Sequence, residues 1–150
     1  MSDNIVYNAA ATILLVDDDE MVRHLLFASL RGAGFSVAMA ADANEALDWI
    51  GTTHHLPKLL VTDVDMPGMT GIELARRTQT LGHCPILLIS GKTPEAALTE
   101  SWEFLPKPFT PAVFVSVVQK IVSNAERTQS DARIQPTPES RHDRLVRKAR

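Results

Sequence analysis

Several features that mark other protein classes are scarce or absent in this chain of 150 residues. Its single cysteine, Cys84, has no partner for an internal disulfide, which fits a reducing compartment. No apolar run approaches the roughly 20 residues that a membrane span needs, and the N-terminus lacks the basic segment of a signal peptide. We therefore expect a soluble, cytoplasmic protein.

Positive and negative side chains are unevenly distributed along the chain. Residues 1–123 carry 8 basic and 14 acidic side chains, a net charge of −6, whereas residues 124–150 carry 7 and 4, a net charge of +3. This second segment is polar and contains two prolines, so we predict that residues 124–150 form a disordered basic tail. The tail would follow an N-terminal leader (1–11) and one domain (12–123). Basic charge in a tail leaves open a contact with nucleic acid or with an acidic surface.

Short apolar runs alternate with helical patterns along the domain, which predicts an α/β fold: a parallel sheet with helices on both faces. The five predicted strands cover residues 12–16, 36–40, 59–62, 86–90 and 103–105. The fifth helix is the clearest, because Thr110 can cap it and its apolar face continues to Val122, after which the pattern stops at Ser123.

Side chains that carry charge or a hydroxyl follow four of the predicted strands. Asp17 and Asp18 come after the first strand, Asp63 after the third, Ser90 at the end of the fourth and Lys107 after the fifth. In an open parallel sheet, the carboxyl ends of the strands share one crevice, so we expect these groups to converge. Crowded carboxylates need a compensating cation, and hard oxygen ligands favour Mg²⁺ or Ca²⁺.

Phosphoryl transfer gives each of these groups a role. Asp17 and Asp18 can hold Mg²⁺, directly or through its water shell. Asp63 can act as a nucleophile that forms an acyl phosphate. The Ser90 hydroxyl and the Lys107 ammonium would then orient and neutralise the phosphoryl oxygens during an in-line transfer.

The same residues are similar to a known family. Over residues 12–122 the chain resembles the receiver domain of bacterial two-component response regulators, of the single-domain type. The resemblance rests on four segments in this order: LVDDD (15–19), TDVDMPGMTG (62–71), ISG (89–91) and FLPKPF (104–109). It implies a flavodoxin-like, doubly wound sheet with the strand order 2-1-3-4-5.

Position by position, the resemblance implies a role for each matching residue. It implies that Asp63 is the phosphoacceptor and that Asp17, Asp18 and Asp63 hold Mg²⁺ together with the backbone carbonyl of Asp65. Lys107 corresponds to the lysine that binds the phosphoryl oxygen in this family.

The resemblance also implies a switch. Ser90 and Phe104 correspond to the hydroxyl and the aromatic ring that move together on phosphorylation, while Asp65 and Lys92 lie where the family tunes the lifetime of the phosphoryl group. The interval from Ser90 to Lys107 is shorter than is usual in the family, so we predict a shortened fourth helix.

The expected function is therefore that of a signalling receiver in a two-component or phosphorelay pathway. Its donor would be a sensor histidine kinase or a histidine phosphotransfer protein, and its only reactions would be self-phosphorylation and slow self-dephosphorylation. A phosphate sink without its own output is an alternative. A haloacid-dehalogenase-type phosphatase fits less well, because no acidic cluster follows between residues 109 and 123, and nucleic-acid binding would depend on the tail.

The remaining chemistry-bearing residues have simpler interpretations. Asp19 is expected to cap the first helix or to face water, and Cys84 to pack beside a strand. Met21 and Phe27 of the first helix and Val115 of the fifth are candidates for contacts with a partner.

Overall fold

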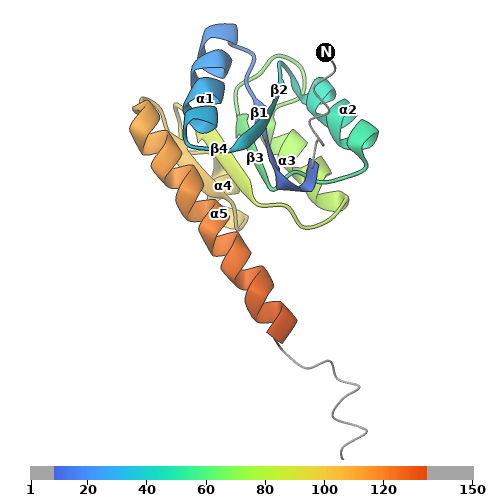
Figure 1. Cartoon of the computed structure of the whole chain (residues 1–150). Coiled ribbons are helices and arrows are strands. Elements are labelled where there is room, and N and C mark those ends of the chain that lie inside the picture. The colour runs from blue at the N-terminus through green and yellow to red at the C-terminus, as the bar shows by residue number, and fades with distance from the viewer. Residues whose placement is uncertain (1–8, 135–150) are drawn as a thin grey trace, which may run out of the picture.

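The computed structural model describes residues 9–134, in which five parallel strands alternate with helices (Figure 1). The strands are β1 (Thr12–Val16), β2 (Ser36–Ala40), β3 (Leu59–Asp63), β4 (Ile86–Ser90) and β5 (Glu103–Pro106). The α-helices are α1 (Glu20–Gly32), α2 (Ala43–Thr53), α3 (Gly71–Thr80), α4 (Glu95–Thr99) and α5 (Pro111–Ile134), and a 3-10 turn, η1 (Ala9–Ala11), precedes β1. The strand order is β2-β1-β3-β4-β5, as predicted.

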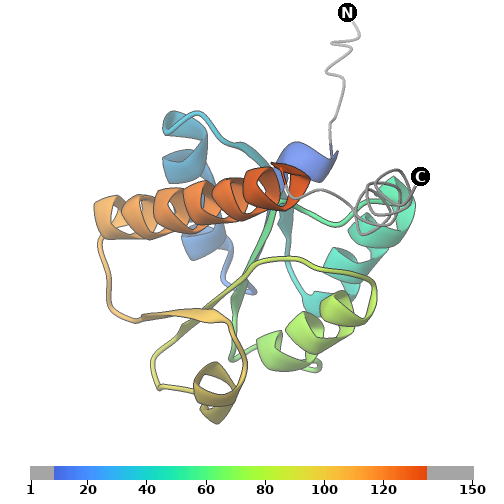
Figure 2. The ribbon, with the colours of Figure 1, turned by 90° about the horizontal axis from the view of Figure 1, so that it is seen from below.

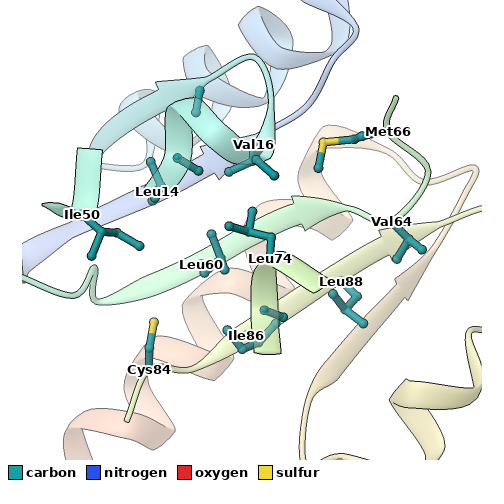
Figure 3. Packing of buried hydrophobic residues seen from close by; sticks show 14 of the residues in the cluster. Leu14, Val16, Ile50, Leu60, Val64, Met66, Leu74, Cys84, Ile86 and Leu88 are labelled. Carbon is teal, nitrogen blue, oxygen red and sulfur yellow. The ribbon is translucent and has the colours of Figure 1, made fainter. Parts of the chain in front are cut away.

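The sheet buries both of its faces, because side chains alternate between them along each strand. In β1, Leu14 and Val16 join one apolar cluster, and Ile13 and Leu15 join the other. Helices α2, α3 and α4 cover the first face, and α1 and α5 cover the second (Figure 2). Figure 3 shows the first cluster, where strand side chains meet Leu74 of α3. The central strands β1, β3 and β4 are consequently buried at every residue.

Side-chain caps start four of the helices directly after the loops that leave the sheet. Each cap accepts a hydrogen bond from the backbone N–H three residues ahead. The pairs are Asp19 with Val22 (3.1 Å), Asp42 with Glu45 (2.8 Å), Thr70 with Glu73 (3.2 Å) and Thr110 with Val113 (3.2 Å). These caps fix where each loop ends, so the loops stay at the carboxyl edge of the sheet.

The fourth helix is short, as predicted from the interval between Ser90 and Lys107. Helix α4 has only five residues and no side-chain cap at Pro94. Beside it, Trp102 is only 8% exposed and belongs to the same apolar cluster as Ala96. An aromatic side chain therefore covers part of the sheet here.

The predicted stop of the last helix at Ser123 is wrong, because α5 continues to Ile134 and runs beyond the sheet (Figure 1). The residues after Ser123 are polar, yet many are strong helix formers, and no helix-breaking residue comes before Pro136. An ion pair of 3.3 Å between Lys58 Nζ and Glu126 Oε1 ties the extension to the loop before β3. The predicted boundary therefore falls inside a helix, while the rest of the predicted tail lies outside the described residues.

Across residues 9–134, no helix combines the length and the apolar character that crossing a membrane would require.

Candidate functional site

The predicted site residues meet at the carboxyl edge of the sheet. Asp17 directly follows β1, Asp63 ends β3, Ser90 ends β4, and Lys107 directly follows β5. Strands β1 and β4 flank β3 in parallel register, which brings residues far apart in the sequence to neighbouring positions. Lys107 is tied to this edge because its backbone N–H donates to the carbonyl of Ser90 at 2.9 Å.

Three carboxylates form the centre of the site. Asp17 is 1% exposed, Asp63 is 6% exposed and Asp18 is exposed, and one oxygen from each lies within 4.8 Å of the others. In the described part of the chain, no other trio of histidine, cysteine or acidic side chains meets in this way. Like charges at such short range repel one another, and burial weakens their screening by water.

The repulsion affects the protonation of Asp17. Burial raises the pKa of Asp17, and the negative charges of Asp63 and Asp18 raise it further. A hydrogen bond of 2.9 Å from the N–H of Asp19 to Oδ1 and the charge of Lys107 act in the opposite direction without cancelling the increase. The ionised form of Asp17 is therefore held in the fold at a cost to stability.

Lys107 supplies the positive charge of the site. Its Nζ lies 3.1 Å from Oδ2 of Asp63, and the peptide bond from Lys107 to Pro108 is cis. Burial lowers the pKa of Lys107, but the hydrogen bond to Asp63 and the charges of Asp63, Asp17 and Asp18 outweigh that effect and raise the pKa overall. The lysine is thus positively charged at neutral pH and faces the Asp63 carboxylate.

One oxygen of the site is suited to bind a cation. Oδ2 of Asp17 is buried and has no hydrogen-bond partner among the described residues. Buried polar atoms almost always have a partner, and a bound ion is one of the few explanations for an exception. Mg²⁺ binds through one or two carboxylates while keeping several waters, so Asp17, Asp18 and Asp63 fit it. The contribution of the Asp65 carbonyl stays a prediction.

Ser90 ends β4, the strand next to the one that ends at Asp63. Its side chain is almost fully buried, and its Oγ accepts a hydrogen bond of 3.2 Å from the N–H of Lys92. Phe104 is half-buried in β5 and packs against the cluster beneath α2, α3 and α4. Both residues predicted to form the switch are therefore present, and no described hydrogen bond links Ser90 to an aspartate.

The two predicted tuning residues lie at the rim. Asp65 and Lys92 are both exposed. The N–H of Asp65 donates to Oδ1 of Asp63 at 3.3 Å. The Asp63 carboxylate thus has a donor on each oxygen, one from Asp65 and one from Lys107.

Sequence reasoning missed two residues that hold the site in place. Arg23 donates from Nη1 to the backbone carbonyl of Asp17 at 2.8 Å, one turn after the cap of α1. Gly71, the first residue of α3, lies directly against the backbone of Asp63. Gly71 is the last residue of the TDVDMPGMTG motif and Arg23 follows the LVDDD motif, but neither contact can be read from one strand or one helix alone.

Asp19 and Cys84 are structural residues, as expected. Asp19 caps α1. Cys84 is buried, and burial raises the pKa of its thiol to about 12. Phe27 and Val115 are partly buried against the cluster beneath α1 and α5, whereas Met21 is 84% exposed. Of these candidates for partner contacts, Met21 is thus the most accessible.

A doubly wound sheet with paired acids after β1, an aspartate at the end of β3 and a lysine after β5 has the architecture of a receiver domain. Comparison with known families agrees. A model of the response regulator receiver domain family matches residues 13–119, and the chain belongs to this family.

The relatives with curated descriptions are response regulators. The response regulator MprA of Mycobacterium avium is 39% identical over 103 residues, which cover 65% of this chain and 44% of that protein. The C4-dicarboxylate transport transcriptional regulatory protein DctD of Rhizobium meliloti is 29% identical over 133 residues, covering 85% and 27%. The chain thus spans less than half the length of these relatives.

Solved structures share the fold over nearly their whole length. The chemotaxis protein CheY4 of Vibrio cholerae is 32% identical, with a TM-score of 0.65, and the match covers 75% of this chain and 99% of that one. The receiver domain of the hybrid histidine kinase CckA has the same identity and TM-score, covering 74% and 98%. The part of this chain that matches is therefore the size of a single receiver domain.

Proposed function

We propose that this chain is a phosphorylation-dependent signalling receiver that accepts a phosphoryl group on Asp63. One observation carries the proposal: Asp63 is a buried carboxylate 3.1 Å from the Lys107 ammonium, in a group with Asp17, whose Oδ2 has no partner among the described residues. An ammonium group and a second buried carboxylate close to the same aspartate suit the transfer of a charged phosphoryl group.

The donor is a phosphohistidine on a sensor histidine kinase or on a histidine phosphotransfer protein. A carboxylate oxygen of Asp63 attacks the phosphorus, so a P–O bond forms while the P–N bond breaks, and the electron pair of that bond leaves with the histidine nitrogen. Asp17, Asp18, Asp63 and the carbonyl of Asp65 would hold Mg²⁺, whose charge offsets that of the phosphoryl oxygens. Lys107 passes from the Asp63 carboxylate to a phosphoryl oxygen.

The output is a change in surface contacts. In the unphosphorylated protein the Ser90 hydroxyl accepts a bond from the Lys92 N–H. We propose that it turns to a phosphoryl oxygen after transfer and that the half-buried Phe104 ring moves inward. Asp65 and Lys92, exposed at the rim, adjust how easily water reaches the phosphoryl group. A cytoplasmic location, typical of response regulators, is part of the same proposal.

The donor protein would dock on an apolar patch beside the site. A pocket of about 270 Å³ opens between α1 and the loop after β5. Its lining residues are Val22, Leu25, Leu26, Lys107, Pro108, Phe109 and Pro111. Leu25 is 54% exposed although apolar, and Lys107 connects the pocket to Asp63. A domain that presents a phosphohistidine from an apolar helix surface fits this position.

A charge in this patch should distinguish transfer from a protein donor, which must dock, from transfer from a small-molecule donor. We expect Leu25→Asp to lower the transfer rate from a phosphorylated histidine kinase, chosen by screening candidate kinases, at least about tenfold. Phosphorylation by phosphoramidate, which needs no docking surface, should be unchanged. Leu98→Asp is the matched control, because Leu98 is 77% exposed on α4. Equal losses with both donors would remove the docking proposal.

The site itself is tested by the chemistry of its product. Full-length protein incubated with Mg²⁺ and phosphoramidate should gain one phosphoryl group in an adduct that is stable to acid and labile to base. Asp63→Asn should abolish the adduct, whereas Asp65→Asn, an exposed neighbour, should keep it and change only its lifetime. A folded wild-type protein that forms no adduct would contradict the proposal.

Two of the alternatives remain open. A phosphate sink uses the same chemistry, so a pull-down that compares phosphorylated and unphosphorylated protein is needed to distinguish it from an effector. Nucleic-acid binding concerns a tail that lies largely outside the described residues, and a steep loss of affinity with salt would be its signature. The phosphatase alternative is set aside, because the family match covers the residues on which it rested.

A further inference from the structure

The first residue of α3 lies closer to the phosphoacceptor backbone than any side chain would allow. A Cβ added to Gly71 would stand 2.0 Å from the carbonyl oxygen of Asp63, 2.9 Å from its carbonyl carbon and 3.0 Å from Oγ1 of Thr62. The first two atoms belong to the backbone of a buried strand end, so they cannot yield as a flexible side chain would. Among the seven glycines, only Gly71 meets backbone atoms in this way.

The same carbonyl is held by a buried hydroxyl. Thr62 is fully buried, and its Oγ1 donates to the carbonyl oxygen of Asp63 at 2.9 Å. The next residue, Val64, accepts from the N–H of Gly71 at 3.0 Å and donates to the carbonyl of Ile89 at 2.9 Å. The backbone on both sides of the Asp63 side chain is therefore fixed to α3, to β4 and to the Thr62 hydroxyl.

We propose that Thr62 and Gly71 are positioning residues for phosphoryl transfer to Asp63. The inference rests on the proposed function, since it concerns the same nucleophile. A shift of the Asp63 backbone moves its carboxylate relative to Lys107 Nζ, 3.1 Å away, and relative to the Asp17 and Asp18 oxygens within 4.8 Å. In-line transfer depends on this alignment, and a displacement of about 1 Å can slow a reaction about a hundredfold.

A role limited to stability makes a different prediction. Both residues are packed, so substitutions that only weaken the fold would lower the fraction of folded protein without changing the rate of each folded molecule. A positioning role lowers the rate per folded molecule at saturating Mg²⁺. Saturating Mg²⁺ is needed for this comparison, because Asp63 is itself one of the proposed Mg²⁺ ligands and its displacement can also weaken metal binding.

Two pairs of variants of the full chain separate these readings. Thr62→Val removes the hydroxyl and keeps the shape, whereas Thr62→Ser keeps the hydroxyl and removes the methyl group. Gly71→Ala adds the methyl group that meets the Asp63 carbonyl, and Gly51→Ala is its control, since a Cβ there meets nothing within 4 Å. The measurement is the rate constant for phosphorylation by phosphoramidate across a Mg²⁺ titration, normalised to folded protein by thermal unfolding.

We expect Thr62→Val to be about tenfold slower and Gly71→Ala about a hundredfold slower than wild type. Thr62→Ser should lie within about twofold of wild type, and Gly51→Ala should equal it. Wild-type rates in folded Thr62→Val would overturn the inference, even if Gly71→Ala fails to fold. An unreactive wild-type protein would instead overturn the proposed function.

Discussion

The polar groups at the two ends of the sheet differ in whether they have partners. At the amino ends of the strands, Lys58 pairs with Glu126, and Cys84 is buried as a neutral thiol that donates to the carbonyl of Pro57 at 3.4 Å. At the carboxyl ends, three carboxylates crowd together, and the Asp17 Oδ2 has no partner in the described residues. The polar groups at the amino end therefore contribute stability. At the carboxyl end, the buried negative charge of Asp17 is available to a ligand.

Removing the negative charge of Asp17 should produce the largest change in Mg²⁺ affinity and in stability. We expect Asp17→Asn to weaken Mg²⁺ binding about 100-fold, because a carboxylate ligand is lost. The metal-free variant should be more stable than wild type at neutral pH, on the order of 1 kcal/mol, because a buried charge is removed. Isothermal titration and chemical denaturation without metal measure the two effects, and a less stable metal-free variant would contradict the comparison.

The stability effect of Asp17 should depend on pH. Its pKa is raised in the folded protein, so the fold binds the proton more tightly than the unfolded chain does. As pH falls from neutral through the raised pKa, this group adds stability, and the addition is complete below the unfolded value of 3.8. The stability gap between Asp17→Asn and metal-free wild type should therefore narrow in acid. A constant gap would argue against a charged, buried Asp17.

Cys84 gives a dependence of the same sign in the alkaline range, at the other end of the sheet. Its pKa rises from 9.0 to about 12 in the fold, so the unfolded chain ionises first as pH increases. Wild-type protein should lose on the order of 1 kcal/mol of stability between pH 9 and pH 10, and Cys84→Ala should lack that slope. Denaturation between pH 9 and 10 measures it, below the range in which Lys107 titrates. Equal slopes in both proteins would mean that the thiol ionises in the fold.

The smallest effect is expected at the surface pair of the amino end. Glu126 is largely exposed, so Glu126→Gln should cost less than about 1 kcal/mol and should not change Mg²⁺ binding. The loss should shrink further at high salt, as it does for exposed pairs. Denaturation at low and high salt provides the measurement. A change in Mg²⁺ affinity would show that the two ends are coupled and that the comparison is too simple.

The strands were readable from the sequence because each is a short apolar run between turn signals. The bounds of β1, β2 and β4 were predicted to the residue, and β3 and β5 extend one residue further, to Asp63 and Pro106. The extension of α5 was not predicted, because helix propensity alone continues it where the apolar face has ended. The polar composition of residues 124–134 therefore does not indicate disorder.

The sequence predicts which residues form the site, but it does not predict the contacts that position them. The ends of the strands identified Asp17, Asp63 and Lys107, since parallel strands deliver their ends to one edge. The hydrogen bond from Arg23 to the Asp17 carbonyl and the contact of Gly71 with Asp63 depend on how the helices pack on the sheet. No pattern along a single chain segment reports such contacts.

We propose that the carboxyl end of the sheet holds a cation beside a phosphoacceptor. Peptide mass mapping of full-length protein after incubation with phosphoramidate, in Mg²⁺ and in excess chelator, tests it most directly. We predict a phosphoryl group on the peptide that contains Asp63, formed in Mg²⁺ and lost with the chelator. A phosphoryl group on another residue, or an equal yield without metal, would contradict the account.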